Sequence, residues 1–332
     1  MGKRLVTLVT CQWSDLPFEE LCKTAKQMGY DGLELAVWGN AFDLDKAYED
    51  DNYIKFIKDT LKKYDLVVPV LATHIIGQCV SDLDDPRLNN FAPASCANNH
   101  EKIHAWAVES MKKAAVVAKK LGVKVISGFT GSPIWRYLYS FPQTPEEMVE
   151  AGFKKVREDW LPILDVFKEN GVKFALEVHP GEIAFDYYSA KRILETFKDR
   201  PEFGLTFDPS HLLWQGVTPH VYLNDFADRV YNIHMKDAAV RLDGRTGLLG
   251  SHIDFGDLRR GWNFRSLGHG DVNFEEIIRV LNAHNYYGNL SVEWEDSGME
   301  RISGATEACA FVRKVDFEPS NVKFDDAISN TK

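Results

Sequence analysis

The sequence has few cysteines, and no two of them stand in a CxxC spacing. The five cysteines are Cys11, Cys22, Cys79, Cys96 and Cys309, scattered along 332 residues. Structural zinc sites draw on closely spaced cysteine pairs, and disulfide frameworks draw on even sets, so neither is expected here. A reducing, cytoplasmic environment is the default expectation for such a chain.

Long apolar runs and excess positive charge are also missing. No stretch reaches the roughly 18 apolar residues that span a bilayer. The first residues, MGKRLVTLVTCQW, have no clear apolar segment followed by a small-residue cleavage site. Acidic residues number 49 against 39 basic ones, which gives a formal net charge of −10. Because an acidic surface repels phosphate backbones, we expect neither a membrane nor a nucleic-acid partner.

What the sequence does contain is a regular alternation of short β-branched runs with longer amphipathic ones. The short runs predict strands and the longer ones predict helices, in eight successive pairs. The predicted strands are 4–11, 32–38, 66–74, 123–129, 172–179, 203–208, 230–237 and 289–295. The predicted helices lie near 17–29, 52–64, 101–121, 145–170, 188–199, 218–227, 274–286 and 299–314.

Eight strand–helix units match a closed (β/α)₈ barrel in number and in size. The competing α/β arrangement is a doubly wound sheet, which normally has a glycine-rich phosphate turn after its first strand. The sequence has TCQWSDLP at that place, and no linker divides the chain. We therefore predict a single TIM barrel over residues 1–315, followed by a polar C-terminal tail at 316–332.

Three predicted connections are too long to be simple turns. They cover residues 75–100, 130–144 and 238–273, and each follows a strand. Loops that follow strands lie at the C-terminal mouth of a barrel, where TIM-barrel enzymes place their chemistry. The segment 239–267 is either a folded flap, a subunit contact or a lid that enlarges the pocket.

Polar side chains stand at or near the ends of the last four predicted strands. In VKFALEVH (172–179), alternation puts the apolar residues on one face and Glu177 with His179 on the other. The same alternation aims Asp208 of FGLTFD, His234 of VYNIHMKD and Glu293 of LSVEWE into the barrel. Neighbouring strands lie about 4.8 Å apart, so these side chains can meet at one point.

Three carboxylates and one imidazole that share a buried point need a counter-charge. Without it, like charges repel and some of the groups take up protons. One divalent cation resolves this, and the oxygen-rich donor set suits Mn²⁺ best, with Mg²⁺ or Co²⁺ possible and Zn²⁺ less suited. The predicted metal ligands are Glu177, Asp208, His234 and Glu293. Salt bridges are the alternative for any one inward carboxylate, but three carboxylates and a histidine on four consecutive strands are hard to explain in that way.

Four motifs carry a family resemblance: LEVHP, FDPSH, HMKD and VEWE. With them, nearly the whole chain resembles the xylose-isomerase-like barrel superfamily. This superfamily includes sugar and sugar-phosphate isomerases and epimerases, inosose dehydratases and the endonuclease IV type of repair enzyme. The resemblance implies the same four metal ligands. It also implies a substrate-contacting histidine at His211 and a substrate-binding arginine near Arg241.

The resemblance implies a divalent-metal-dependent isomerase or epimerase acting on a ketose or sugar phosphate. Glu177 and Glu293, on opposite sides of the metal, would remove and return a proton through a metal-stabilised enediolate. If the intermediate instead expels a β-substituent, the enzyme is a carbon–oxygen lyase or dehydratase acting on a keto-sugar, cyclitol or 3-keto-glycoside. These reactions share a first step, so the residues barely separate them. The acidic charge disfavours phosphodiester cleavage, and the intact ligand set disfavours a barrel that only binds sugars.

Other residues at the predicted mouth are candidates to contact a small carbohydrate substrate. Beside His211 and Arg241, they are Lys236, His179, Trp38 and His74. The Lys236 ammonium would offset the negative charge of the carboxylates or polarise a substrate oxygen. Glu34, on the second strand, is a weaker candidate, and Asp237 is expected to point outward and anchor a loop. We further expect a homo-oligomer.

Overall fold

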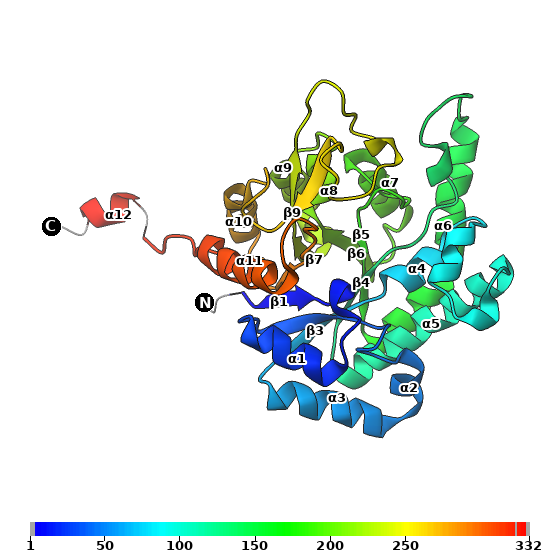
Figure 1. The fold of residues 1–332 in the computed structure, drawn as a ribbon, viewed down its shortest axis with the longest axis horizontal. Helices are drawn as coiled ribbons and strands as arrows, with labels where there is room; N and C mark the ends of the chain where they lie inside the picture. Colours follow the sequence, from blue (N-terminus) through cyan, green and yellow to red (C-terminus); the bar gives the residue numbers. More distant parts are fainter. Residues whose placement is uncertain (1–3, 323, 330–332) are drawn as a thin grey trace.

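Eight parallel strands form a closed barrel, and helices surround it (Figure 1). The computed structural model describes residues 4–322 and 324–329. Parts of two predicted segments lie outside the described residues: 1–3 of the barrel domain, and 323 and 330–332 of the tail. The barrel strands are β1 (Val6–Val9), β2 (Gly32–Ala36), β3 (Val67–Ala72), β4 (Val125–Gly128), β5 (Lys173–Glu177), β6 (Phe203–Phe207), β7 (Val230–Met235) and β10 (Leu290–Val292).

The order of the strands around the barrel is β1-β10-β7-β6-β5-β4-β3-β2. The circle closes where Val6 of β1 lies opposite Leu290 of β10. Strands such as β2 and β6 are buried along their whole length, as expected for parallel strands covered by helices on one side and packed inside a barrel on the other. The predicted (β/α)₈ fold is confirmed.

Eight helices follow the barrel strands close to the predicted positions. They are α1 (Phe18–Gln27), α3 (Asp51–Lys63), α5 (His100–Leu121), α6 (Glu146–Asn170), α7 (Tyr187–Thr196), α9 (Pro219–Phe226), α10 (Phe274–Ala283) and α11 (Arg301–Val315). Glycines with positive φ follow the last residues of α5 and α6, Gly122 at 83° and Gly171 at 65°. A left-handed residue ends a helix at little steric cost only when it lacks a Cβ atom.

Several elements were not predicted. The loops contain α2 (Leu44–Glu49), α4 (His74–Ser81) and α8 (Pro209–Leu213), and the tail contains α12 (Phe324–Ser329). The segment predicted as a long loop after β7 contains an antiparallel hairpin, formed by β8 (Asp237–Val240) and β9 (Trp262–Arg265). The third strand ends at Ala72, so His74 begins α4 and does not end a strand as predicted.

In the part of the chain that the structure describes, no helix combines the length and the apolar character needed to cross a bilayer.

Candidate active site

A cavity of about 780 Å³ opens at the C-terminal ends of the barrel strands. Its ionisable lining residues are Cys11, His74, Glu177, His179, His211, Lys236, Glu293, Glu295 and Asp296. Its aromatic lining residues are Trp38, Phe129, Trp214, Phe255, Trp262, Phe264 and Trp294. The cavity therefore lies at the mouth where TIM barrels place their chemistry, and it combines charged groups with large ring faces.

The structure brings the four predicted metal ligands together. Glu177 ends β5, Asp208 follows β6, His234 lies on β7 and Glu293 directly follows β10. One ligand atom of each lies within 4.8 Å of all the others, and all four side chains are buried. The physical reason is the two-residue alternation along parallel strands, which points the lumen-facing side chains toward the same axis.

Three of these side chains present buried atoms without a hydrogen-bond partner in the described part of the chain: Asp208 Oδ2, His234 Nδ1 and Glu293 Oε2. The Asp208 Oδ1 atom caps α8 and accepts from the backbone N–H of Ser210 at 2.8 Å and from its hydroxyl at 2.7 Å, which leaves Oδ2 for the cluster. His234 Nδ1 lies 3.0 Å from Glu293 Oε2 without hydrogen-bond geometry. Such a set of unpaired donor atoms fits a divalent cation.

The pKa shifts of the carboxylates reflect strong local fields. Burial by itself would raise the pKa of Glu177, but the surrounding imidazoles, with His234 foremost, hold that pKa well below its ordinary value. Burial would also raise the pKa of Glu293, but the Lys236 ammonium and the His234 ring together outweigh it, so that this pKa lies below its ordinary value too. Asp208 differs, because burial raises its pKa to about 6. The carboxylates thus depend on nearby positive charge.

A fully buried carboxylate contacts His234, one of the four predicted metal ligands. Glu34 of β2 places Oε1 3.0 Å from Nε2 of His234, and its Oε2 accepts a hydrogen bond from the side-chain amide of Asn232 at 2.9 Å. Burial would lower the pKa of His234, but Glu34 and two carboxylates of the cluster raise it well above its ordinary value. The surroundings of His234 therefore favour positive charge.

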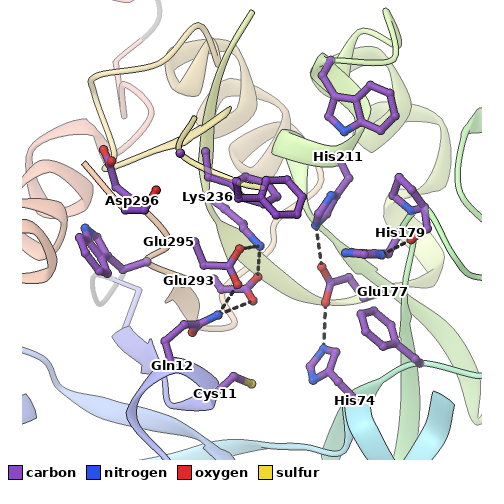
Figure 2. Close-up of a pocket in the computed structure, with 18 of the residues that line it drawn as sticks. Cys11, Gln12, His74, Glu177, His179, His211, Lys236, Glu293, Glu295 and Asp296 are labelled. Atoms are coloured by element: carbon purple, nitrogen blue, oxygen red, sulfur yellow. Dashed lines mark hydrogen bonds and ion pairs between the residues drawn. The ribbon is translucent and has the colours of Figure 1, made fainter. Parts of the chain in front are cut away.

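Two histidines contact the Glu177 carboxylate from different sides (Figure 2). His74 Nε2 lies 2.8 Å from Oε2, and His211 Nε2 lies 3.4 Å from Oε1 and 3.3 Å from Asp208 Oδ2. The ring of His179 lies 4.0 Å from that of His211, centre to centre. Burial and the neighbouring His211 lower the pKa of His179 to about 3, so its ring is neutral and can accept a hydrogen bond.

Lys236 lies on the other side of the cavity (Figure 2). Its Nζ atom is 3.2 Å from Glu293 Oε2, 3.0 Å from Glu295 Oε2 and 3.9 Å from Asp208 Oδ2. Gln12 donates to Glu295 and, at 3.4 Å, to Glu293. Glu295 and Gln12 were absent from the predicted site residues. Glu295 lies two residues after Glu293, so alternation had already placed it on the inner face.

The β8–β9 hairpin supplies an aromatic wall of the cavity. The ring of Trp262 on β9 stacks on that of Trp214, with centres 4.7 Å apart and planes 3° from parallel. The Arg260 guanidinium lies over the Phe255 ring at 4.2 Å, and the Lys236 ammonium lies over the Phe264 ring at 4.3 Å. The segment is therefore a folded flap whose rings line the pocket, one of the alternatives left open by the sequence.

The structure does not bring Arg241 into the cavity. Its side chain is exposed, and Nη1 lies 2.6 Å from Asp271 Oδ2, outside the residues that line the pocket. The chain turns into the hairpin after β7, so closeness to His234 in the sequence does not place a side chain in the barrel. Asp237 behaves as expected, because its carboxylate accepts hydrogen bonds from the backbone N–H groups of Gly268 at 3.0 Å and Gly270 at 2.9 Å.

A model of the family described as "Xylose isomerase-like TIM barrel" matches residues 22–315. The chain belongs to this family. Among curated proteins, the Bacillus subtilis (strain 168) protein YfiH, itself uncharacterized, is 25% identical over 319 residues, which are 90% of this chain and 95% of YfiH. Inosose dehydratase from Clostridium perfringens (strain ATCC 13124) is 28% identical over 219 residues, 66% of this chain and 69% of that enzyme.

Among solved structures, the apo form of YcjR from E. coli, a 3-keto-D-glucoside 4-epimerase, is similar with a TM-score of 0.66. The identity is 16%, and the match covers 94% of this chain and 100% of YcjR. At this identity the similarity shows the shared fold. The family match extends from before β2 to the end of α11, so it includes the strands β5, β6, β7 and β10 that carry or precede the four residues of the cluster.

Proposed function

We propose that this protein is a divalent-metal-dependent sugar epimerase or isomerase that moves a proton at a carbon beside a carbonyl group. Glu177, Asp208, His234 and Glu293 would hold the ion, with Mn²⁺ as the best-suited cation. When bound, the ion would supply a Lewis acid for negative charge that develops on substrate oxygens. The unpaired donor atoms of the cluster support this assignment.

The observation that carries the proposal is the pair of buried glutamates, Glu177 and Glu293. They come from β5 and from the end of β10, which are separated by β6 and β7 in the barrel, and both line the same cavity. The local charges hold both pKa values below the ordinary value, so both carboxylates are ionised, which is the form that a proton acceptor needs. One glutamate would remove the proton from one face of the substrate carbon, and the other, after taking up a proton from water, would deliver that proton to the opposite face, which is epimerisation.

Neighbouring residues would orient the sugar. His211 and Lys236 each have a donor atom at the cavity wall, near Glu177 and near Glu293 respectively, and would bind substrate oxygens. His179 and His74 complete the polar wall around Glu177. Trp38 and the aromatic residues of the hairpin would cover the C–H faces of the sugar and exclude water from the reacting carbon.

A carbon–oxygen lyase is the second candidate. Inosose dehydratases are among the relatives, with 28% identity over 219 residues in the Clostridium perfringens enzyme. The neutral His179 ring lies beside His211 in the cavity, and it would accept a hydrogen bond from a substrate hydroxyl group. The substrate would then be a keto-sugar, a cyclitol or a 3-keto-glycoside, and the enediolate would expel a β-hydroxyl or a β-alkoxyl group in place of reprotonation.

The test is solvent exchange in D₂O. Protein loaded with Mn²⁺ is incubated with a panel of free ketoses, ketose phosphates, inosose and a 3-keto-glycoside, and the products are followed by NMR and mass spectrometry. We expect one substrate class to gain a single deuterium while its carbon skeleton and oxygens are retained. Loss of water or of an alcohol would identify the lyase instead. Absence of exchange and of elimination with every class would contradict both functions.

Two substitutions make the test specific. Glu177→Gln and Glu293→Gln each remove one proton-transfer carboxylate while keeping the side-chain volume, and each should reduce turnover by at least about 100-fold. The matched control is Glu147→Gln, an exposed position on α6, which should leave turnover unchanged.

A further inference from the structure

Buried polar side chains connect the metal-ligand histidine to the opposite side of the barrel. Glu34 of β2 has no exposed surface, and its two oxygens contact two residues of β7. Oε1 lies 3.0 Å from His234 Nε2, and Oε2 accepts from Asn232 Nδ2 at 2.9 Å. The Asn232 Oδ1 atom in turn accepts from the side-chain amide of Asn289 at 3.1 Å. Glu34 is therefore held at both oxygens, and the Asn232 amide has one orientation that satisfies both neighbours.

These contacts determine which nitrogen of His234 keeps its proton when the ring is neutral, as a metal ligand must be. An ionised carboxylate only accepts hydrogen bonds, so the Nε2 atom that faces Glu34 must be the N–H donor. The lone pair of a neutral ring then lies on Nδ1, and Nδ1 is the atom that faces Glu177 Oε2 at 3.7 Å and Glu293 Oε2 at 3.0 Å. Metal-ligating histidines gain orientation and basicity from a carboxylate in this position.

We infer that Glu34 is a positioning residue that fixes the Nε2–H tautomer of His234 and so presents Nδ1 to the divalent cation. The inference rests on the proposed function, because it concerns the same metal site. Glu34 touches neither the cavity nor the other ligands of the set. Its effect is exerted through one imidazole ring, which distinguishes it from the four residues that would bind the ion.

Glu34→Gln tests the inference with almost no change of volume. Asn232 Nδ2 is a hydrogen-bond donor, so it will bind the carbonyl oxygen of the new glutamine. The glutamine N–H₂ group must then face His234 Nε2. A donor at that place favours the wrong tautomer, with the proton on Nδ1. Loss of such a supporting carboxylate costs about 10–100-fold in metal affinity, and we expect a weakening of this size in a Mn²⁺ titration followed by electron paramagnetic resonance.

A second substitution should rescue the first. In Glu34→Gln combined with Asn232→Asp, the new aspartate accepts from the glutamine N–H₂ group and from Asn289. The glutamine carbonyl oxygen then faces His234 Nε2–H again. We expect the double variant to recover most of the Mn²⁺ affinity lost by E34Q, although the negative charge now lies one side chain further from the imidazole.

The outcomes separate this inference from the proposed function. If the wild type binds Mn²⁺ and E34Q binds it equally well, or if the double variant is as weak as E34Q, Glu34 does not position the ligand and the proposed metal site stands. If the wild type fails to bind Mn²⁺, the metal site itself fails, and the inference fails with it. Should E34Q not fold, ¹⁵N NMR of the wild type with Mg²⁺ bound still decides the point: a proton on Nε2 supports the inference, and one on Nδ1 overturns it.

Discussion

The Lys236 ammonium competes with a cation for the same carboxylates. Its Nζ atom lies 3.2 Å from Glu293 Oε2 and 3.9 Å from Asp208 Oδ2, and these are two of the oxygens that would bind the ion. Glu295 holds the ammonium from the other side at 3.0 Å. The lysine therefore offsets part of the negative charge of these carboxylates. It should weaken the binding of a divalent cation, and it should assist turnover by binding a substrate oxygen.

Lys236→Met separates these two effects. We expect Mn²⁺ affinity to rise by about tenfold or more, because removal of a nearby positive charge relieves repulsion of the ion, while turnover falls. Calorimetric titration and the D₂O exchange assay measure the two quantities. Lys23→Met, at an exposed position of α1, is the control for the loss of a lysine. A parallel fall of affinity and turnover would show that the ammonium stabilises the carboxylates and does not compete with the ion.

Strand alternation predicts the positions of the site residues that lie on barrel strands or next to their ends, and of no others. Alternation places Glu177, Asp208, His234 and Glu293 correctly because each lies on a strand or within one residue of its end. Arg241 does not lie in the cavity, because it does not belong to a barrel strand. Its position was judged by closeness in sequence, and the chain had by then left the barrel for β8. The contact of Glu34 with His234 was not predicted, because it joins β2 to β7, two strands that are not neighbours, and a local pattern does not reveal such a contact.

The long loops are folded elements with their own anchors. The turn at residues 130–132 is an example, because the Glu182 carboxylate Oε2 accepts from the backbone N–H groups of Thr130 at 2.8 Å and Gly131 at 2.9 Å. Asp82 accepts from the Ser132 N–H at 2.7 Å. Burial, with a smaller contribution from Asp82, raises the pKa of Glu182 to about 8. The folded protein therefore keeps a proton on Glu182 that the unfolded chain loses.

This shift predicts a pH dependence of stability. Between pH 4.5, the ordinary pKa of the group, and pH 8, the folded state binds more protons than the unfolded state, so the free energy of unfolding falls as the pH rises. The contribution of Glu182 is fully present below pH 4.5 and is lost as the pH passes about 8. Denaturant unfolding across this range should show a decline that is smaller in Glu182→Gln. The exposed control Glu147→Gln should keep the wild-type decline, and equal slopes in all three proteins would contradict the assignment.

Regular elements were predictable and the loop elements were not. Repeated amphipathic patterns ten or more residues long identify α5 or α6 without ambiguity. The short α4 and α8 have only one or two turns, and their stability comes from tertiary contacts such as the Asp208 cap. The two strands of the hairpin are separated by 21 residues with no tight-turn signal, so no local pattern pairs Asp237–Val240 with Trp262–Arg265.

Cation binding should stabilise the entire barrel. The four predicted ligands come from β5, β6, β7 and β10, so the ion would bind the closed barrel and not the unfolded chain. At Mn²⁺ concentrations a hundredfold above Kd, mass action contributes about 2.7 kcal/mol. For a domain of this size the melting temperature should then rise by about 3–6 °C, as measured by calorimetry. Asp208→Asn should abolish most of the rise, and an equal rise in this variant would place the ion elsewhere.

The pairing of β1 with β10 has a further consequence for how the protein is made. Gln12 follows β1 and bonds to Glu293, which follows β10, so the two ends of the barrel share one catalytic wall. A nascent chain that has emerged only as far as α10 lacks both the last ligand and the strand that completes the circle. Chemistry at this mouth can therefore begin only after the final strand has left the ribosome, and a partly synthesised chain would be unable to act on sugars prematurely.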